Sequence, residues 1–259
     1  GIGAAITGMR PVVELQFSDF ITIGMDQVVQ QGANIRYMFG GQIEVSMVLR
    51  GPTGAYLQAA AQHSHMFEAW FAHIPGLKVV LPSDPYDAKG LMISAIRDNN
   101  FVLYFEHKKL YAKKGEVPEE PYEVEIGKAG VKREGTDVSI ISYAYMTQLA
   151  LEVAAELEKV GISAEVVDLR SVSPIDYETI LASVSKTRRA VCLQEAYLAS
   201  SVMSEVAATI NEELYGDLVA PTKRIGAKPA PIPFSPPLEE YILPQKSDIE
   251  AAVHDVLDR

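Results

Sequence analysis

The feature that most constrains the fold is an alternation of strand-like and helix-like segments along the first 111 residues. Short apolar runs at 77–81 and 101–106 flank an amphipathic stretch at 84–97 that has a proline near its start. Further strands are predicted at 11–17 and 45–49, and further helices at 20–32 and 66–74. Strands that alternate with helices in this way favour a largely parallel sheet covered by helices, so we predict an α/β domain.

Residues 112–126 interrupt this alternation. Residues 112–121 are rich in charged side chains and include two prolines, a composition typical of a linker. The alternation then resumes, with strands predicted at 138–143, 164–169 and 190–193 and helices at 147–160, 176–184 and 202–214. We therefore predict two α/β domains, residues 1–111 and residues 127–259, joined by the linker 112–126.

The C-terminal tail differs in composition from both predicted domains. Five prolines between residues 229 and 237 predict an extended chain. Ser247 is expected to be the N-cap of a final helix, because serine side chains accept hydrogen bonds from the free backbone N–H groups there. Cys192 is the single cysteine, so no disulfide can form within the chain, and its apolar neighbours predict a buried, unreactive thiol.

Charge and hydropathy exclude several classes of function. The formal net charge is −11, which repels a phosphate backbone, so we expect no nucleic-acid partner. No apolar stretch reaches the roughly 18 residues of a membrane span, and no secretory signal is present. We expect a cytoplasmic protein or one of an organelle matrix. Residues 1–11 resemble the end of a helix that leads to a strand and lack an initiator Met, so we also expect further sequence upstream.

Polar residues concentrate at 62–65, directly before the predicted aromatic helix. His63 and His65 lie at the mouth of this helix, and Ser64 is positioned to cap it. A histidine in this position could exchange protons near neutral pH. Spacing alone favours the simpler interpretation, in which both histidines lie at the surface or cap the helix.

The end of the predicted helix 84–97 is a second candidate site. Free carbonyl groups at a helix C-terminus, with the carboxylate of Asp98, could bind a hard monovalent cation. An ordinary polar helix end has the same pattern.

The sequence has no P-loop, no G-x-G-x-x-G turn, no His-Glu-x-x-His, no Cys-x-x-Cys and no G-x-S-x-G elbow, so most common cofactor and hydrolase chemistries are excluded.

Several motifs in a fixed order give the sequence a family resemblance. They are YMFGG at 37–41, AAQHS at 60–64, AWFAHIPGLKVV at 69–80, PYDAKGL at 85–91, AIRDNN at 95–100 and PFSP at 233–236. Together they resemble the β subunits of the thiamine-diphosphate-dependent decarboxylase component of 2-oxo acid and acetoin dehydrogenase complexes. The resemblance covers essentially the whole chain. Segments 36–41 and 115–122 are most similar to the acetoin branch, with the pyruvate branch close behind.

The resemblance implies a pyrimidine-binding domain for thiamine diphosphate, truncated at its N-terminus, followed by a transketolase C-terminal-like domain. It also implies an α2β2 heterotetramer in which the α subunit holds the diphosphate through Mg2+. Consistent with this division, Gly216-Asp217 is followed by Leu218, so the chain has no Gly-Asp-Gly magnesium motif. The enzyme would decarboxylate pyruvate or cleave acetoin and pass the acyl group to lipoamide on a dihydrolipoyl acyltransferase core. It would be inactive without its α subunit.

The resemblance also implies roles for individual residues. Phe20 resembles the aromatic residue that packs on the aminopyrimidine ring. His63 resembles the histidine near the reactive thiazolium carbon, which would move protons during acyl transfer. Four backbone oxygens, together with the Asp98 carboxylate, resemble a structural potassium site, and they belong to Met47, Ala95, Asp98 and Asn100.

Three departures from the family pattern leave alternatives open. The family has an activating glutamate shortly before the position of Gly1, which this sequence lacks; His65 replaces a common glutamine; and the stretch after Glu195 lacks its usual glycines. A catalytically silent scaffold subunit and a branched-chain 2-oxo acid dehydrogenase β subunit therefore stay as alternatives. Half of a split transketolase or of a deoxyxylulose-phosphate synthase is disfavoured, because residues 60–73 contain no basic side chain except histidines.

Overall fold

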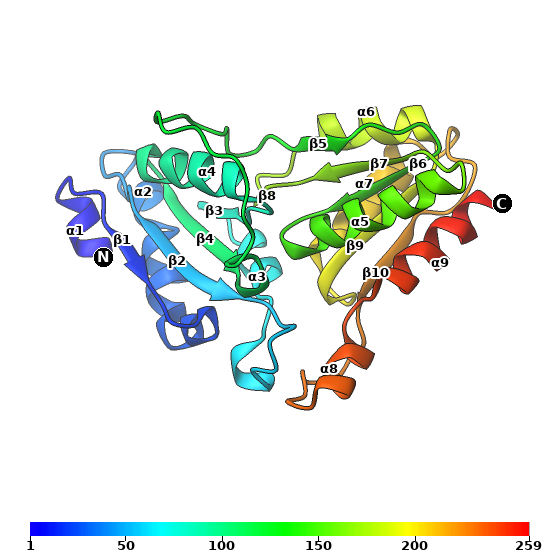
Figure 1. Ribbon diagram of the computed structural model, residues 1–259. Helices are drawn as coiled ribbons and strands as arrows, with labels where there is room; N and C mark the ends of the chain where they lie inside the picture. The colour runs from blue at the N-terminus through cyan, green and yellow to red at the C-terminus, as the bar shows by residue number, and fades with distance from the viewer. Residues whose placement is uncertain (259) are drawn as a thin grey trace.

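The computed structural model describes residues 1–258, which form two five-stranded sheets (Figure 1). The strands of the first sheet, in spatial order, are β1 (Val12–Glu14), β2 (Val48–Thr53), β4 (Phe101–His107), β3 (Leu77–Val80) and β8 (Ser171–Ser173). The first four are parallel, whereas β8 comes from the second half of the chain and pairs antiparallel with β3. The predicted parallel sheet is confirmed, with one edge strand supplied by distant sequence.

Several short helices and one long helix accompany this sheet. They are α1 (Ile2–Ile6), the 3-10 helix η1 (Ser18–Gly24), the π-helical turn η2 (Gln27–Gly32), α2 (Ile35–Met38), the 3-10 helix η3 (Ala61–His63), α3 (Glu68–Ala72), α4 (Pro85–Arg97) and the 3-10 helix η4 (Lys108–Leu110). The Asp84 carboxylate caps α4 by accepting a hydrogen bond from the N–H of Asp87 at 2.8 Å, and a proline occupies the first turn. The predicted helix at 20–32 is helical but built from 3-10 and π turns, and the strand predicted at 45–49 begins only at Val48.

The strands of the second sheet, in spatial order, are β10 (Lys223–Ala227), β9 (Ala190–Tyr197), β6 (Val138–Ser142), β7 (Ala164–Asp168) and β5 (Gly130–Arg133). Its helices are α5 (Tyr145–Lys159), α6 (Tyr177–Thr187), α7 (Val202–Glu213), α8 (Pro236–Ile242) and α9 (Lys246–Leu257). The sequence pattern did not predict β5, β8, β10 or α8. The N-cap prediction for Ser247 is wrong, because α9 begins after Gln245, whose N–H donates to the Asp248 carboxylate at 2.8 Å.

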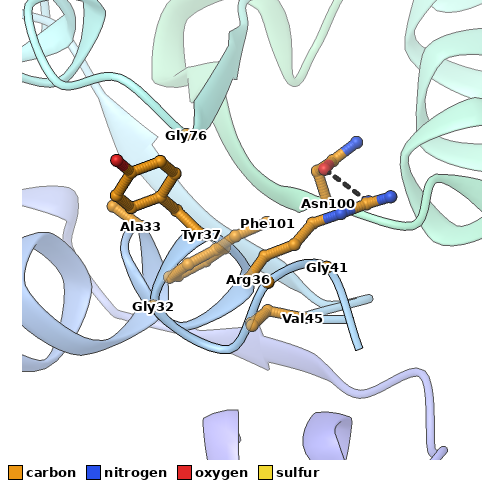
Figure 2. A pocket seen from close by; sticks show the side chains of 10 residues that line it. Gly32, Ala33, Arg36, Tyr37, Gly41, Val45, Gly76, Asn100 and Phe101 are labelled. Atoms are coloured by element: carbon orange, nitrogen blue, oxygen red, sulfur yellow. Dashed lines mark hydrogen bonds between the residues drawn. The ribbon is translucent and has the colours of Figure 1, made fainter. Parts of the chain in front are cut away.

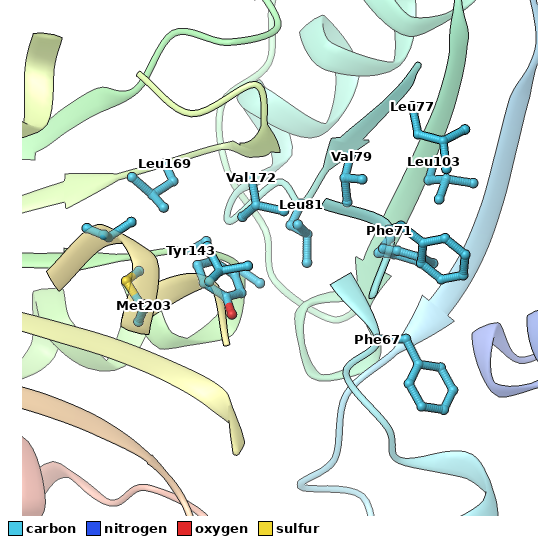
Figure 3. Close-up of a cluster of buried hydrophobic side chains, with 14 of the residues drawn as sticks. Phe67, Phe71, Leu77, Val79, Leu81, Leu103, Tyr143, Leu169, Val172 and Met203 are labelled. Carbon is cyan, nitrogen blue, oxygen red and sulfur yellow. The ribbon is translucent and has the colours of Figure 1, made fainter. Parts of the chain in front are cut away.

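A continuous apolar core joins the two halves (Figure 3). Phe71 and Leu81 from the first half belong to one cluster of buried side chains with Tyr143 and Met203 from the second. Cys192 is buried in the same cluster, which confirms the prediction of a buried thiol. Among the described residues, no helix is long and apolar enough to cross a bilayer.

The segment 112–126 contains no helix or strand and packs along α4. Tyr122 stacks on Tyr86 with ring centroids 4.5 Å apart. Lys89 of α4 donates a hydrogen bond to the carbonyl oxygen of Glu119 at 2.9 Å. The chain between the two sheets is therefore held against the first half and is not a free tether.

Candidate functional site

The predicted site residues Phe20 and His63 lie next to each other, one on η1 and the other at the end of η3. Their ring centroids are 5.7 Å apart, and the ring of Phe17 lies 5.1 Å from that of His63. Phe20 is 40% exposed, whereas Nδ1 of His63 is buried and has no hydrogen-bond partner. The structure thus places an accessible aromatic ring beside a histidine whose buried Nδ1 has no hydrogen-bond partner.

Further unpartnered polar atoms come from the same segments. The buried side-chain atoms without a partner in residues 18–19 and 63–68 are Ser18 Oγ, Asp19 Oδ2, His63 Nδ1, Ser64 Oγ and Glu68 Oε2. Buried polar groups are nearly always hydrogen-bonded, so such a concentration marks a place for a polar ligand or ordered water. The prediction that Ser64 caps the aromatic helix is wrong, because Phe67 stands at the N-cap of α3 and no side chain bonds there.

Asp19 holds the segment that follows His63. Its Oδ1 accepts a hydrogen bond from the backbone N–H of His65 at 3.2 Å and lies 2.7 Å from Nδ1 of the same residue. The imidazole of His65 also stacks on Phe67, with ring centroids 4.7 Å apart. His65, which stands where glutamine is common in the family, is therefore hydrogen-bonded through Asp19 to η1, the helix that also carries Phe20.

Glu68 is a buried acid that the sequence analysis missed. It is 1% exposed on α3, and its Oε1 accepts a hydrogen bond at 2.6 Å from the hydroxyl of Tyr143, which belongs to the second half. Burial raises the pKa of Glu68 from 4.5 to about 7, although the Tyr143 hydrogen bond acts in the opposite direction. The available signal was a single acid within the strongly apolar segment 66–74.

A cavity of about 340 Å³ lies between the two halves, beside residues 64–67. Ser64, His65 and Trp70 line it from the first half. Glu195 and Tyr197, both on β9, line it from the second. Both halves of the chain therefore contribute to the surroundings of the candidate site.

A second pocket, of about 390 Å³, is lined by the segment that is most similar to the acetoin branch (Figure 2). Arg36 and Tyr37 line it together with Phe101. Arg36 donates a hydrogen bond to Oδ1 of Asn100 at 2.8 Å, which connects this segment to the predicted cation site. None of the residues that line it belongs to the pair formed by Phe20 and His63.

The predicted cation site lies where α4 ends and β4 begins. Oδ1 of Asp98 accepts a hydrogen bond from the N–H of Asn100 at 2.8 Å, and the carbonyl of Met47 accepts one across the strands at 3.0 Å. Although burial favours the neutral acid, the hydrogen bond from Lys78 helps to hold the pKa of Asp98 below its ordinary value. Arg10 donates to the carbonyl of Asp98 at 2.8 Å. A cation at the predicted position would therefore share the Asp98 carbonyl with the Arg10 guanidinium.

The chain is thus a two-domain α/β protein with Phe20 and His63 together on its first unit. The transketolase pyrimidine binding domain matches residues 1–114. The transketolase C-terminal domain matches residues 127–249. A chain of a split-gene transketolase, solved as an inactive β4 tetramer, has the same fold. The TM-score is 0.80 at 25% identity, over 99% of this chain and 79% of that one.

Curated relatives narrow the assignment. Subunit β of acetoin:2,6-dichlorophenolindophenol oxidoreductase from Cupriavidus necator is 48% identical over 256 residues, covering 99% of this chain and 76% of the relative. The pyruvate dehydrogenase E1 component subunit β of Bacillus subtilis is 48% identical over 258 residues, covering 99% and 79%. The 2-oxoisovalerate dehydrogenase subunit β of the same organism is 46% identical, covering 100% and 80%. The chain belongs to the family of pyruvate and acetoin dehydrogenase E1 β subunits.

Proposed function

We propose that this chain is the β subunit of a thiamine-diphosphate-dependent E1 component that decarboxylates pyruvate or cleaves acetoin and transfers the acyl group to lipoamide. The observation that carries the proposal is the pairing of the exposed Phe20 ring with the unpartnered Nδ1 of His63. The acetoin and pyruvate relatives are equally similar at 48%, so both substrates are proposed, with the branched-chain relative at 46% as the alternative. A transketolase half is less well supported, since that neighbour is 25% identical.

The side chains of the site would perform two tasks. Bound thiamine diphosphate would supply the electron sink for carbon–carbon cleavage. Phe20 would pack on the aminopyrimidine ring, a contact worth about 0.5–1.5 kcal/mol beyond its buried area. His63 would hold or deliver a proton at the imidazole during acyl transfer. The α subunit would bind Mg2+ with the diphosphate, as the resemblance implies, and this chain has Leu218 after Gly216-Asp217 in place of a Gly-Asp-Gly motif.

The proposed partner is an α subunit in an α2β2 heterotetramer, which in turn binds a dihydrolipoyl acyltransferase core in the cytoplasm or an organelle matrix. Large apolar side chains on the segment that follows Phe20 support a protein partner. Ile23 is 84% exposed, Tyr37 89% and Met38 69%. Large exposed apolar side chains such as these are typical of surfaces that another chain covers.

The decisive experiment is a turnover assay on the full-length protein, co-expressed with its α subunit. His63→Ala should lower lipoyl acylation by about 10²–10⁴-fold, the usual contribution of a positioned acid–base group. His73→Ala is the matched control, because His73 is an exposed histidine ten positions further on, and it should keep full activity. Unchanged turnover in His63→Ala would remove the assigned role. Failure of the unaltered complex with pyruvate, acetoin and branched-chain 2-oxo acids alike would favour the silent scaffold subunit.

Two structural assignments belong to the same proposal. Residues 1–111 would be the pyrimidine-binding domain, residues 112–126 the linker and residues 127–259 the transketolase C-terminal-like domain.

Backbone oxygens of Met47, Ala95, Asp98 and Asn100 would bind K+. A cation that binds only the folded protein, at a concentration 100 times its Kd, increases the free energy of unfolding by about 2.7 kcal/mol. K+ should therefore raise the Tm above that in an equal concentration of Na+, and an equal Tm in both salts would contradict this site.

A further inference from the structure

The loop that carries His63 is held at its beginning by two buried carboxylates from the second half of the chain. We call residues 55–65 the histidine loop. The Glu195 carboxylate on β9 accepts a hydrogen bond from the N–H of Ala55 at 2.6 Å. The Glu239 carboxylate on α8 accepts from the N–H of Gln58 at 3.2 Å and from its side-chain amide at 3.0 Å. The first four residues of the loop are thus fixed by side chains that are distant in sequence.

The far end of the histidine loop is held by the first half. Asp19 accepts hydrogen bonds from His65, as described above. Nζ of Lys108 donates a hydrogen bond to the backbone carbonyl of His63 itself. The same ammonium lies 4.8 Å from the centroid of the Phe17 ring, a cation–π contact. Lys108 is therefore bonded directly to the main chain of the proposed acid–base residue.

The four side chains that hold the loop are charged and buried. Asp19, Glu195 and Glu239 are 8%, 3% and 2% exposed, and buried carboxylates are costly unless a cation or hydrogen-bond donors balance them. Lys108 is 7% exposed. Burial lowers its pKa below the ordinary value, while the three carboxylates oppose this by favouring the ammonium form. Nδ1 of His107 accepts a hydrogen bond from the backbone N–H of Lys109 at 3.2 Å, so its Nε2 is the atom that donates to Glu195 at 2.6 Å.

The backbone of the histidine loop is strained between these anchors. Tyr56, Gln58 and Ala60 have φ of 66°, 51° and 62°, a region that non-glycine residues seldom adopt. Ala60 also has ψ of −175°, which places it in a region occupied almost only by glycine. Such conformations persist only where the surroundings enforce them. The strain and the four anchors therefore point to the same conclusion from independent observations.

We propose that Lys108 and the three carboxylates Asp19, Glu195 and Glu239 form a hydrogen-bonded clamp that fixes the histidine loop and so places the imidazole of His63. Lys108 is a positioning residue, since it touches the backbone of His63 and no reacting atom. Two of the three carboxylates belong to the second half of the chain, so the docking of the two halves determines the geometry of the site. The functional part of this inference rests on the proposed role of His63, whereas the structural part does not.

Hydrogen exchange measures the structural part on the full-length protein in complex with its α subunit. Lys108→Met should speed the exchange of the backbone amides in residues 55–65 by about tenfold or more, with both sheets unchanged. Glu239→Gln preserves volume and should have a smaller effect in the same direction, so the test survives if Lys108→Met fails to fold. Lys114→Met is the matched control, because its side chain is exposed and forms no described hydrogen bond with residues 55–65. Unchanged exchange in both clamp variants would overturn the clamp.

Steady-state kinetics of the same complexes test whether the clamp positions His63. Lys108→Met should lower kcat for lipoyl acylation by about tenfold with KM for the substrate nearly unchanged, and Lys108→Arg should restore part of it. Faster exchange with unaltered kcat would show that the clamp does not serve the site and would overturn the proposal. If His63→Ala retains full turnover while the clamp variants exchange faster, the role of His63 fails and the clamp itself stands.

Discussion

Replacing Glu68 with glutamine tests the energetics of the junction between the two halves. The carboxyl group of Glu68 is fully enclosed, with one oxygen bonded to the Tyr143 hydroxyl and the other without a partner. Burial disfavours its ionised form and raises the pKa from 4.5 to about 7. Glutamine has nearly the same volume, can accept the same hydrogen bond and does not ionise, so the pH dependence of Glu68→Gln lacks the titration of this group.

The sign of the effect follows from proton binding. Below pH 4.5 the acid is protonated in both states, and its contribution to stability is fully present. Between pH 4.5 and about 7 the unfolded chain releases the proton of Glu68 while the folded chain retains it, so stability falls as pH rises. At 1.36 kcal/mol for each pKa unit, the loss above the folded-state pKa amounts to about 3 kcal/mol. Between pH 5 and pH 8 the free energy of unfolding should fall by about 2.5 kcal/mol through this group.

Urea denaturation followed by circular dichroism at pH 5, 6, 7 and 8 measures this contribution. The stability of Glu68→Gln relative to the unaltered protein should increase by about 2.5 kcal/mol across that range. Asp168, whose pKa is raised to about 6 by burial, contributes in the same direction to both proteins and cancels in the difference. Glu213→Gln, a change of an exposed glutamate on α7, is the control and should leave the pH dependence intact. Parallel pH profiles for Glu68→Gln and the unaltered protein would refute the reasoning.

Three further predictions concern the core and the loop. A Cβ on Gly54 would lie 2.2 Å from Nε2 of His107 and φ is +83°, so Gly54→Ala should lower the free energy of unfolding by about 2 kcal/mol or more, as denaturation would show. Ala60→Gly should relieve strain and stabilise by about 1 kcal/mol in the same assay; a destabilised variant would contradict the strain. Burial raises the pKa of the Cys192 thiol to about 12, so iodoacetamide should label it only after unfolding, and rapid labelling of the folded protein would contradict its burial.

The sequence pattern predicted the central strands and the long helices, and it missed three strands at the edges of the sheets. Apolar runs that form central strands, such as β4 and β6, are buried along most of their length and are recognisable from composition. β5, β8 and β10 have 4, 3 and 5 residues and mix buried with partly exposed positions. β8 forms by antiparallel backbone pairing of Ser171 and Ser173 with β3, a strand of the other half. A pairing of this kind depends on tertiary structure and leaves no local signal.

The same limit applies to the candidate site. Phe20 and His63 were predicted by family resemblance, and their proximity in the structure agrees with that prediction without testing their roles. The residues that hold the loop could not be predicted. The bond from Lys108 to His63 spans 45 positions, and that from Gln58 to Glu239 spans 181. Nothing in the local sequence of a lysine or glutamate distinguishes such a partner from an exposed charge.

Some polar groups of the candidate site have hydrogen-bond partners within this chain and others have none, and this difference indicates which part of the site the chain forms by itself. The anchors of the histidine loop are complete within one chain, since the main chain at His63 is bonded to Lys108 and the loop entrance to Glu195 and Glu239. The two proposed site residues have groups without a contact in this chain, since the buried Nδ1 of His63 has no hydrogen-bond partner and Phe20 is 40% exposed. A loop that is fixed before its ligand arrives does not have to be ordered during binding, which reduces the entropic cost of association. The β subunit would therefore present a preorganised histidine, and the proposed α subunit would contribute what binds and encloses the cofactor.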